Sequence, residues 1–144
     1  MARVIFACVH NAGRSQMAAA LFSAMADPNR VAAVSAGTNP SDRVHPEVVD
    51  ALRELGIDIS DRRPQRLTES LAEDATLLIT MGCGDECPYV PGLEREDWPL
   101  TDPKNRPVAE VRQIRDEIRA RVAALIDSRG WRQGLTTAPG AAST

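Results

Sequence analysis

The sequence has few aromatic residues, no excess of positive charge and no long apolar run, and each shortage excludes a class of protein. Aromatic side chains make up 3% of the 144 residues, so the core must consist mainly of aliphatic side chains. A formal net charge of −3 argues against a nucleic-acid-binding protein, because such proteins carry basic surfaces that pair with phosphates. The apolar runs are too short to cross a membrane, and we expect no membrane contact.

Cysteine is also scarce, since three residues are too few for a fold held together by disulfides. The apolar start of the chain is too short for a signal peptide and leads directly into a loop with the first cysteine. We therefore expect a cytoplasmic protein whose thiols serve chemistry. The length suits one domain, placed at residues 1–129, and a flexible tail at residues 130–144 that is rich in Gly, Thr, Ala and Ser.

Apolar runs alternate with helix-forming segments along the chain. We predict strands at residues 3–7, 31–35, 75–81 and 98–100, helices at residues 15–26, 46–56 and 108–126, and a helical turn at residues 67–71. This alternation predicts an α/β fold in which helices flank both faces of a parallel sheet. Such sheets bind ligands beyond the carboxyl ends of their strands, where Cys8, Cys83 and Asp102 are expected to lie.

The loop between the first strand and the first helix predicts an oxyanion site, Cys8-Val9-His10-Asn11-Ala12-Gly13-Arg14-Ser15. Amides at a helix N-terminus lack intrahelical partners and the helix dipole adds positive charge, so residues 9–15 are expected to bind anions. Asn11 and Gly13 tolerate the positive φ angles that such a loop requires. Arg14 offers a planar fork for two oxygens of a tetrahedral anion.

Cys8 opens this loop and is the candidate nucleophile. Positive potential at helix N-termini lowers cysteine pKa values from about 8.5 to about 3.5–7.5. Ser15 is placed to donate a hydrogen bond to the sulfur and hold its charge. The alternative is a structural cysteine, buried at the end of a strand beside a loop that only caps the helix.

Cys83 and Cys87 stand four residues apart, next to Gly82, Gly84 and Pro88. Residues at this spacing on a helix are too far apart for a disulfide, so a Cys83–Cys87 bridge requires a loop or local unwinding, which the glycines and the proline favour. A structural zinc site is disfavoured because the usual C-x2-C spacing is absent, and we predict no metal site. Two incidental loop cysteines are the remaining alternative.

Asp102 precedes Pro103 beyond the predicted last strand. It is either a general acid above the anion loop or the first residue of a turn, since Asp-Pro pairs commonly begin turns. A nucleophile and an anion loop at the same sheet edge favour the acid. His10 and His45 have no evident carboxylate partner and are expected to have surface or capping roles.

Together these segments resemble the arsenate reductases that share the low-molecular-weight protein tyrosine phosphatase fold. The resemblance is carried by residues 8–14, Ser15-Gln16-Met17-Ala18, Ser35-Ala36-Gly37-Thr38, Gly56-Ile57-Asp58-Ile59-Ser60, Met81-Gly82-Cys83, Cys87-Pro88 and Asp102-Pro103. It implies a four-stranded parallel sheet with helices on both faces. It also implies that Cys8 is the nucleophile, that Arg14 and the loop amides hold the oxyanion, that Asp102 is the acid, and that Ser35 braces the loop through Asn11.

The resemblance further implies reduction of arsenate to arsenite by a thiol relay. A Cys8–Cys83 disulfide forms first and is exchanged for a Cys83–Cys87 disulfide, which thioredoxin or a small-molecule thiol reduces. Arsenate and other tetrahedral oxyanions are the implied ligands, thioredoxin is the implied partner, and no tightly bound cofactor is implied. Ala19 stands where some relatives carry a glutamate that helps bind potassium, so no potassium site is expected.

Two other functions remain open at this stage. A phosphatase of the same fold would need only Cys8, Arg14 and Asp102, although Lys104-Asn105-Arg106 lacks the aromatic side chains that would pack a phosphotyrosine ring. A non-catalytic protein could instead bind a metalloid through its three thiols.

Overall fold

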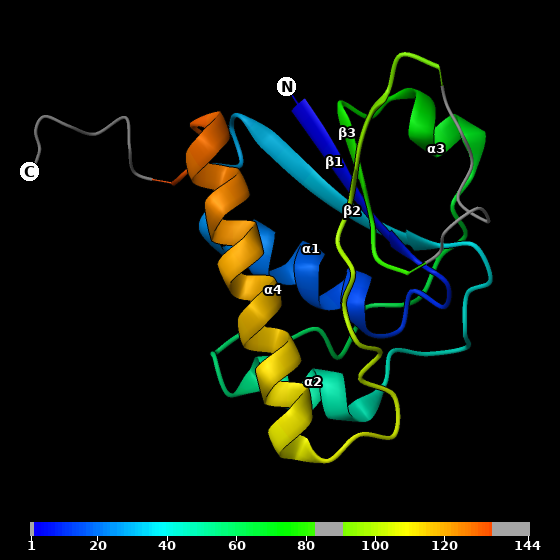
Figure 1. Ribbon diagram of the computed structural model, residues 1–144, viewed down its shortest axis with the longest axis vertical. Helices are drawn as coiled ribbons and strands as arrows, with labels where there is room; N and C mark the ends of the chain where they lie inside the picture. The colour runs from blue at the N-terminus through cyan, green and yellow to red at the C-terminus, as the bar shows by residue number, and fades with distance from the viewer. Residues whose placement is uncertain (1, 83–90, 134–144) are drawn as a thin grey trace, which may run out of the picture.

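The computed structural model describes residues 2–82 and 91–133, and its strands form one parallel sheet in the order β2-β1-β3-β4. The strands are β1 (Ala2–Cys8), β2 (Val31–Gly37), β3 (Leu77–Thr80) and β4 (Glu94–Asp97), and the helices are α1 (Arg14–Met25), α2 (Pro46–Arg53), α3 (Glu69–Glu73) and α4 (Val108–Arg129). Helices lie on both faces of the sheet (Figure 1), so the predicted α/β architecture is confirmed.

The side chains of β1 alternate between two apolar layers. Val4 and Phe6 join the larger core with α1, α2 and α4, whereas Ile5 and Ala7 face a smaller core that α3 closes. All four side chains are fully buried, because β1 lies between β2 and β3 and both of its faces are covered. Cys8 therefore reaches the carboxyl edge of the sheet from its most protected strand.

Helix α1 is apolar on nearly all sides because it lies between the sheet and α4. Its residues from Ser15 to Phe22 are buried without interruption. The Phe22 ring packs edge-on against Phe6 of β1 with ring centroids 5.7 Å apart. A helix with this pattern belongs to the interior of a domain, which makes its N-terminus a fixed platform for the preceding loop.

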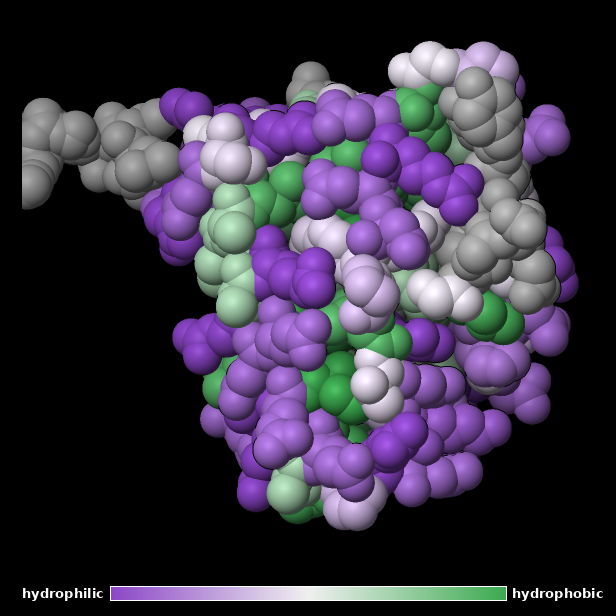
Figure 2. Space-filling view, viewed as in Figure 1, coloured by the Kyte–Doolittle hydropathy of each residue, from purple (hydrophilic) through white to green (hydrophobic). Residues whose placement is uncertain are grey.

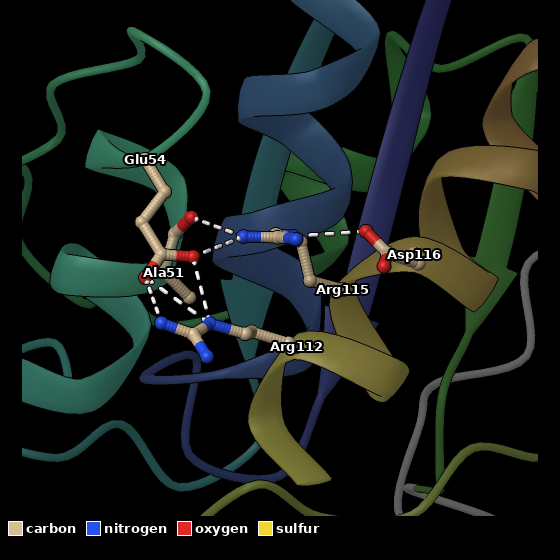
Figure 3. A network of polar contacts seen from close by, with 5 residues as sticks. All are labelled: Ala51, Glu54, Arg112, Arg115 and Asp116. Carbon is tan, nitrogen blue, oxygen red and sulfur yellow. Dashed lines mark hydrogen bonds and ion pairs between the residues drawn. The ribbon is translucent and has the colours of Figure 1, made fainter. Parts of the chain in front are cut away.

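A group of polar contacts joins α2 to α4 (Figure 3). The Arg115 guanidinium, on α4, donates from Nη1 to the Ala51 carbonyl oxygen and to Glu54 Oε1, each at 2.8 Å. Arg112, one turn earlier, binds both carboxylate oxygens of Glu54. These arginines hold the pKa of Glu54 at about 2, below its usual 4.5. The contacts hold the C-terminal end of α2 against α4.

The prediction of a last strand at residues 98–100 is wrong. The strand is β4, whose Glu94, Arg95, Glu96 and Asp97 are all exposed at the edge of the sheet. The apolar side chain of Trp98 is the reason for the prediction of a strand at residues 98–100. Trp98 instead follows the strand and packs into the core against Phe6. Charged side chains suit an edge strand because they discourage pairing with other chains, and they also remove the apolar pattern that identifies strands.

The other elements lie where they were predicted, with shifted ends. Strand β2 extends to Gly37, β3 is shorter than predicted, α2 ends at Arg53, and the predicted helical turn is α3, which Thr68 caps. Helix α4 continues to Arg129, where Gly130 adopts a left-handed conformation with φ 72°. Residues 130–133 return to the domain through Trp131, and residues 134–144 of the predicted tail lie outside the described part of the chain.

The face that carries α2 and α4 is mainly hydrophilic, with smaller apolar areas between the polar side chains (Figure 2). Within the described ranges, no helix has the length and apolar character needed to cross a membrane.

Candidate active site

The loop from Cys8 to Gly13 turns its carbonyl oxygens outward. The carbonyls of residues 8, 9, 10 and 12 accept hydrogen bonds of 2.8 to 3.2 Å from the amides of Thr38, Asn39, Ser41 and His45. The amides of residues 9–15 donate no hydrogen bond to any other described residue. These donors lie in the loop before the buried helix α1 and in its first two residues, so they form a concave array with positive potential that suits an oxyanion.

Asn11 stabilises the shape of the loop through its backbone conformation and its hydrogen bonds. It is fully buried and has a φ of 51°, in the left-handed region. Its Oδ1 accepts from the Gln65 amide at 2.9 Å and from Gln16 Nε2 at 3.1 Å, and Gln16 Nε2 also donates to its carbonyl oxygen. These bonds offset the strain of the left-handed conformation and hold the loop in its concave shape.

Cys8 and Asn11 are linked through Ser15, the second residue of α1. Asn11 Nδ2 donates to Ser15 Oγ at 2.7 Å, and Ser15 Oγ lies 2.9 Å from Cys8 Sγ. Because Asn11 supplies the proton of its own contact with Ser15, the Ser15 hydroxyl proton is available to donate to the sulfur when Cys8 is a thiolate. Cys8 is a free cysteine and is almost fully buried at the base of the loop.

Arg14 is the first residue of α1, and its guanidinium is held by contacts outside the loop. Its Nη1 donates to the Leu100 carbonyl oxygen at 3.1 Å, and its Nη2 lies 3.8 Å from Asp102 Oδ2. Gly82, just past β3, adopts a φ of 90°, and a Cβ at this position would lie 2.6 Å from Arg14 Nη1. The guanidinium is thus fixed from two directions, with donors remaining for an anion.

Asp102 stands at the start of a compact turn. Its Oδ1 accepts from the Lys104 amide at 3.0 Å, and the Arg106 amide bonds the Pro103 carbonyl oxygen at 3.2 Å. The side chain of Asp102 is 45% exposed, so its contact with Arg14 leaves it open to solvent and substrate. Asp102 therefore begins a turn and also places its carboxylate 3.8 Å from Arg14, while its role as the acid stays a prediction.

The two histidines flank this arrangement. His10 Nδ1 lies 3.1 Å from the Asn39 carbonyl oxygen, at the rim of the loop. His45 immediately precedes α2, and its amide donates to the Ala12 carbonyl oxygen at 2.9 Å. Burial lowers the pKa of His45 below 6.5, although the charges of Glu47 and Asp102 oppose this shift.

The expected contact between Ser35 and Asn11 is absent. Ser35 lies within β2, and its carbonyl oxygen accepts from the Gln65 side chain at 2.8 Å. The main chain of Gln65 provides the support that was expected from Ser35. Ser35 pairs with Phe6 in the register of β1 and β2, two positions before the Gly37 that pairs with Cys8.

Cys83 and Cys87 lie outside the described residues, and the structure therefore does not place the two predicted disulfide partners. Among the residues that are described, no three His, Cys, Asp or Glu side chains come together as metal ligands would.

Asn39, Ser41 and Gln65 support the loop and were not predicted from the sequence, and no supporting role was predicted for Gln16, Thr38 or His45. A glutamine within the buried, alanine-rich α1 is a usable signal, because a buried polar side chain needs partners. The outward hydrogen bonds to residues 38–45 come from main-chain amides and leave no mark in residue type.

The comparisons with known proteins agree with this geometry. The family model described as low molecular weight phosphotyrosine protein phosphatase matches residues 3–133. A putative arsenate reductase from Halobacterium salinarum is 37% identical over 126 residues, which cover 85% of this chain and 89% of the relative. A glutaredoxin arsenate reductase from Synechocystis sp. is 35% identical over 129 residues, which cover 88% and 97%.

A solved structure gives the same result. The thioredoxin-dependent arsenate reductase from Corynebacterium glutamicum matches with a TM-score of 0.77 and 41% identity, over 89% of this chain. This chain spans 61% of the length of that protein. The chain therefore belongs to the low molecular weight phosphotyrosine protein phosphatase family, within its arsenate reductase branch.

Proposed function

We propose that this protein reduces arsenate to arsenite, with Cys8 as the nucleophile. The observation that carries the proposal is the outward pairing of the loop carbonyls, which leaves the amides of residues 9–15 available beside Cys8 and Arg14. Arsenate is a tetrahedral oxyanion and fits such a cradle of donors. The arsenate reductase relatives support the same substrate.

In the first step the Cys8 thiolate attacks arsenic, and the hydroxyl group that departs from arsenate takes a proton from Asp102 and leaves as water. A covalent bond between sulfur and As(V) results. Ser15 stabilises the thiolate before the attack, since its hydroxyl lies within hydrogen-bonding distance of the sulfur. Arg14 and the loop amides neutralise the charge on the remaining arsenate oxygens.

In the second step the Cys83 thiolate attacks the Cys8 sulfur. The electron pair of the arsenic–sulfur bond passes to arsenic, arsenite leaves, and a Cys8–Cys83 disulfide forms. Cys87 then attacks Cys83, which frees Cys8 and leaves a Cys83–Cys87 disulfide. Thioredoxin or a small-molecule thiol supplies two electrons to reduce this bond, so the cycle uses no tightly bound cofactor. A reducing compartment such as the cytoplasm suits this chemistry.

The test is arsenite production with thioredoxin, thioredoxin reductase and NADPH, compared across Cys8→Ser, Cys83→Ser and Cys87→Ser. The relay requires that all three variants lose turnover. Turnover retained by Cys87→Ser would mean that the Cys8–Cys83 disulfide is resolved without Cys87, by a small-molecule thiol where one is added or by another route such as direct attack by thioredoxin. Arsenite production that survives Cys8→Ser would overturn the proposal.

A phosphatase is the second candidate, because the family model is that of a phosphatase and Cys8, Arg14 and Asp102 suffice for phosphate ester hydrolysis. The segment Lys104-Asn105-Arg106 after Asp102 lacks the aromatic side chains that would pack a phosphotyrosine ring, which argues against this substrate. Hydrolysis of an aryl phosphate by the Cys83→Ser/Cys87→Ser double variant, without arsenite production by the wild type, would favour the phosphatase. Tight arsenite binding without any turnover would instead indicate a thiol sensor.

A further inference from the structure

His45 connects three parts of the site through its main chain and its ring. Its amide donates to the Ala12 carbonyl oxygen at 2.9 Å, and its own carbonyl oxygen accepts from the amides of Val48 and Val49 in the first turn of α2. The backbone of His45 is therefore fixed both to the anion loop and to a helix that Arg115 holds against α4. The Cα atom from which the His45 side chain extends is therefore held in place.

The ring of His45 shares the space beside Gly13 with the ring of Pro103. A Cβ on Gly13 would lie 2.9 Å from Pro103 Cγ and 3.4 Å from His45 Cδ2. Glycine at this position allows the segment that carries Asp102 to approach the anion loop. On the solvent side, His45 lines a cleft of about 460 Å³ together with Lys104 and Asn105, which belong to the same turn as Pro103.

The charged groups around His45 do not outweigh the effect of burial on its ring. Glu47 on α2 and Asp102 favour its protonation, whereas burial, Lys104 and His10 oppose it. Burial is the largest of these effects and lowers the pKa of His45 below 6.5. The neutral form of the ring is consequently the major one at pH 7, and packing is the interaction that it offers to the Asp102 segment.

We propose that His45 is a positioning residue for Asp102: its ring fills the space beside Gly13, supports Pro103, and thereby holds the carboxylate 3.8 Å from Arg14 at the mouth of the anion loop. The proposal rests on the proposed function only in its assignment of Asp102 as the acid. The position of the segment is a property of the fold and is measurable without turnover.

Amide hydrogen exchange measures that position directly. The amides of Lys104 and Arg106 are bonded to Asp102 Oδ1 and to the Pro103 carbonyl oxygen, so their protection reports on the turn. In His45→Ala we expect their protection to fall about tenfold, whereas His45→Phe, which keeps a planar ring, should retain most of it. The amides of β1 serve as the fold reference. If His45→Ala loses β1 protection as well, His45→Gln replaces it as the variant without a ring.

Kinetics provide the second measurement. In His45→Ala the kcat for arsenate reduction should fall about tenfold, because small displacements of a catalytic group are costly, while inhibition by phosphate stays within about twofold. In the Asp102→Asn background the same change should have no further effect on kcat, since the group that His45 positions is gone. Asp50→Asn, which lines the same cleft on α2, is the matched control and should leave kcat and exchange unchanged.

The outcomes separate this proposal from the proposed function. Unchanged protection of Lys104 and Arg106 in both variants without a ring, or additive effects of His45→Ala and Asp102→Asn, would overturn the role of His45 alone. Absence of arsenate reduction by the wild type would overturn the function, and the exchange data would still decide whether His45 holds the turn.

Discussion

Arg14 Nη1 occupies the space into which any side chain at Gly82 would project, since a Cβ there would lie 2.6 Å away. Gly82 follows β3 with a φ of 90°, so it approaches the guanidinium as only glycine can. Residue 82 immediately precedes Cys83 in the sequence. The arginine proposed to bind the oxyanion is thus held by the segment that leads to the second cysteine of the proposed relay.

We expect Gly82→Ala to weaken phosphate binding about tenfold, because the new methyl group displaces Arg14 from the Leu100 carbonyl oxygen. Gly92→Ala is the matched control. Gly92 has a similar φ of 83°, and no atom of the described residues lies within 4 Å of its Cβ position, so the expected cost is the backbone strain, about 1 kcal/mol. Calorimetric titration with phosphate would contradict the role of Gly82 if both variants bound equally well.

The hydroxyl of Ser15 is expected to control the reactivity of Cys8. In a Cys83→Ser/Cys87→Ser background, where Cys8 is the only thiol, Ser15→Ala should slow alkylation by iodoacetamide at neutral pH about tenfold. A hydrogen bond to a charged group contributes about 1.5–3 kcal/mol, and its loss destabilises the thiolate. Ser15→Thr keeps the hydroxyl and should react at close to the parent rate. Equal rates for all three proteins would show that the contact of 2.9 Å has no chemical effect.

The anion loop was predictable because its determinants are local. Cys8, Gly13 and Arg14 lie within a few residues of one another between a strand and a helix, and the order of elements sets the edge on which they lie. Its support was not predictable, because residues 38–45 and Gln65 contact the loop across long sequence separations, largely through main-chain atoms. Ser35 was assigned a role that the main chain of Gln65 fulfils.

The error in the last strand has a related cause. Periodicity detects strands through buried side chains, and β4, the last strand of the described sheet, buries none of its four residues. Trp98 supplied the apolar signal but belongs to the core after the strand, where it packs 5.8 Å from the Phe6 ring. Sequence reasoning therefore placed the strand a few residues late and still placed Asp102 correctly beyond it.

Glu54 should make stability depend on pH in the acid range. Hydrogen bonds from Arg112 and Arg115 lower its pKa from 4.5 to about 2, so the native state resists protonation more than the unfolded chain does. The stabilisation is fully present above pH 4.5 and is lost as the pH falls toward 2. The difference in unfolding free energy between wild type and Glu54→Gln should therefore shrink over that range.

Urea denaturation at several pH values measures this difference. Glu117→Gln is the control, because it removes a carboxylate from an exposed i,i+4 pair with Arg121 on α4. Its difference from the wild type should be small at every pH, as surface ion pairs contribute little. A constant difference for Glu54→Gln between pH 5 and pH 2.5 would contradict the coupling of Glu54 to the two arginines.

His45 should cause a similar loss of stability on acidification, at a higher pH than Glu54. Burial lowers its pKa in the native state, whereas the histidine of the unfolded chain titrates near 6.5. Well above 6.5 both states hold a neutral ring, so the effect on stability is absent. As the pH falls through 6.5 the unfolded chain takes up a proton that the native state resists, and the native state loses stability.

The unfolding free energy of the wild type should therefore decline relative to that of His45→Gln between pH 8 and pH 5, measured by urea denaturation at constant ionic strength. A wild type that gains stability relative to this variant on acidification would mean that Asp102 and Glu47 outweigh burial at this ring.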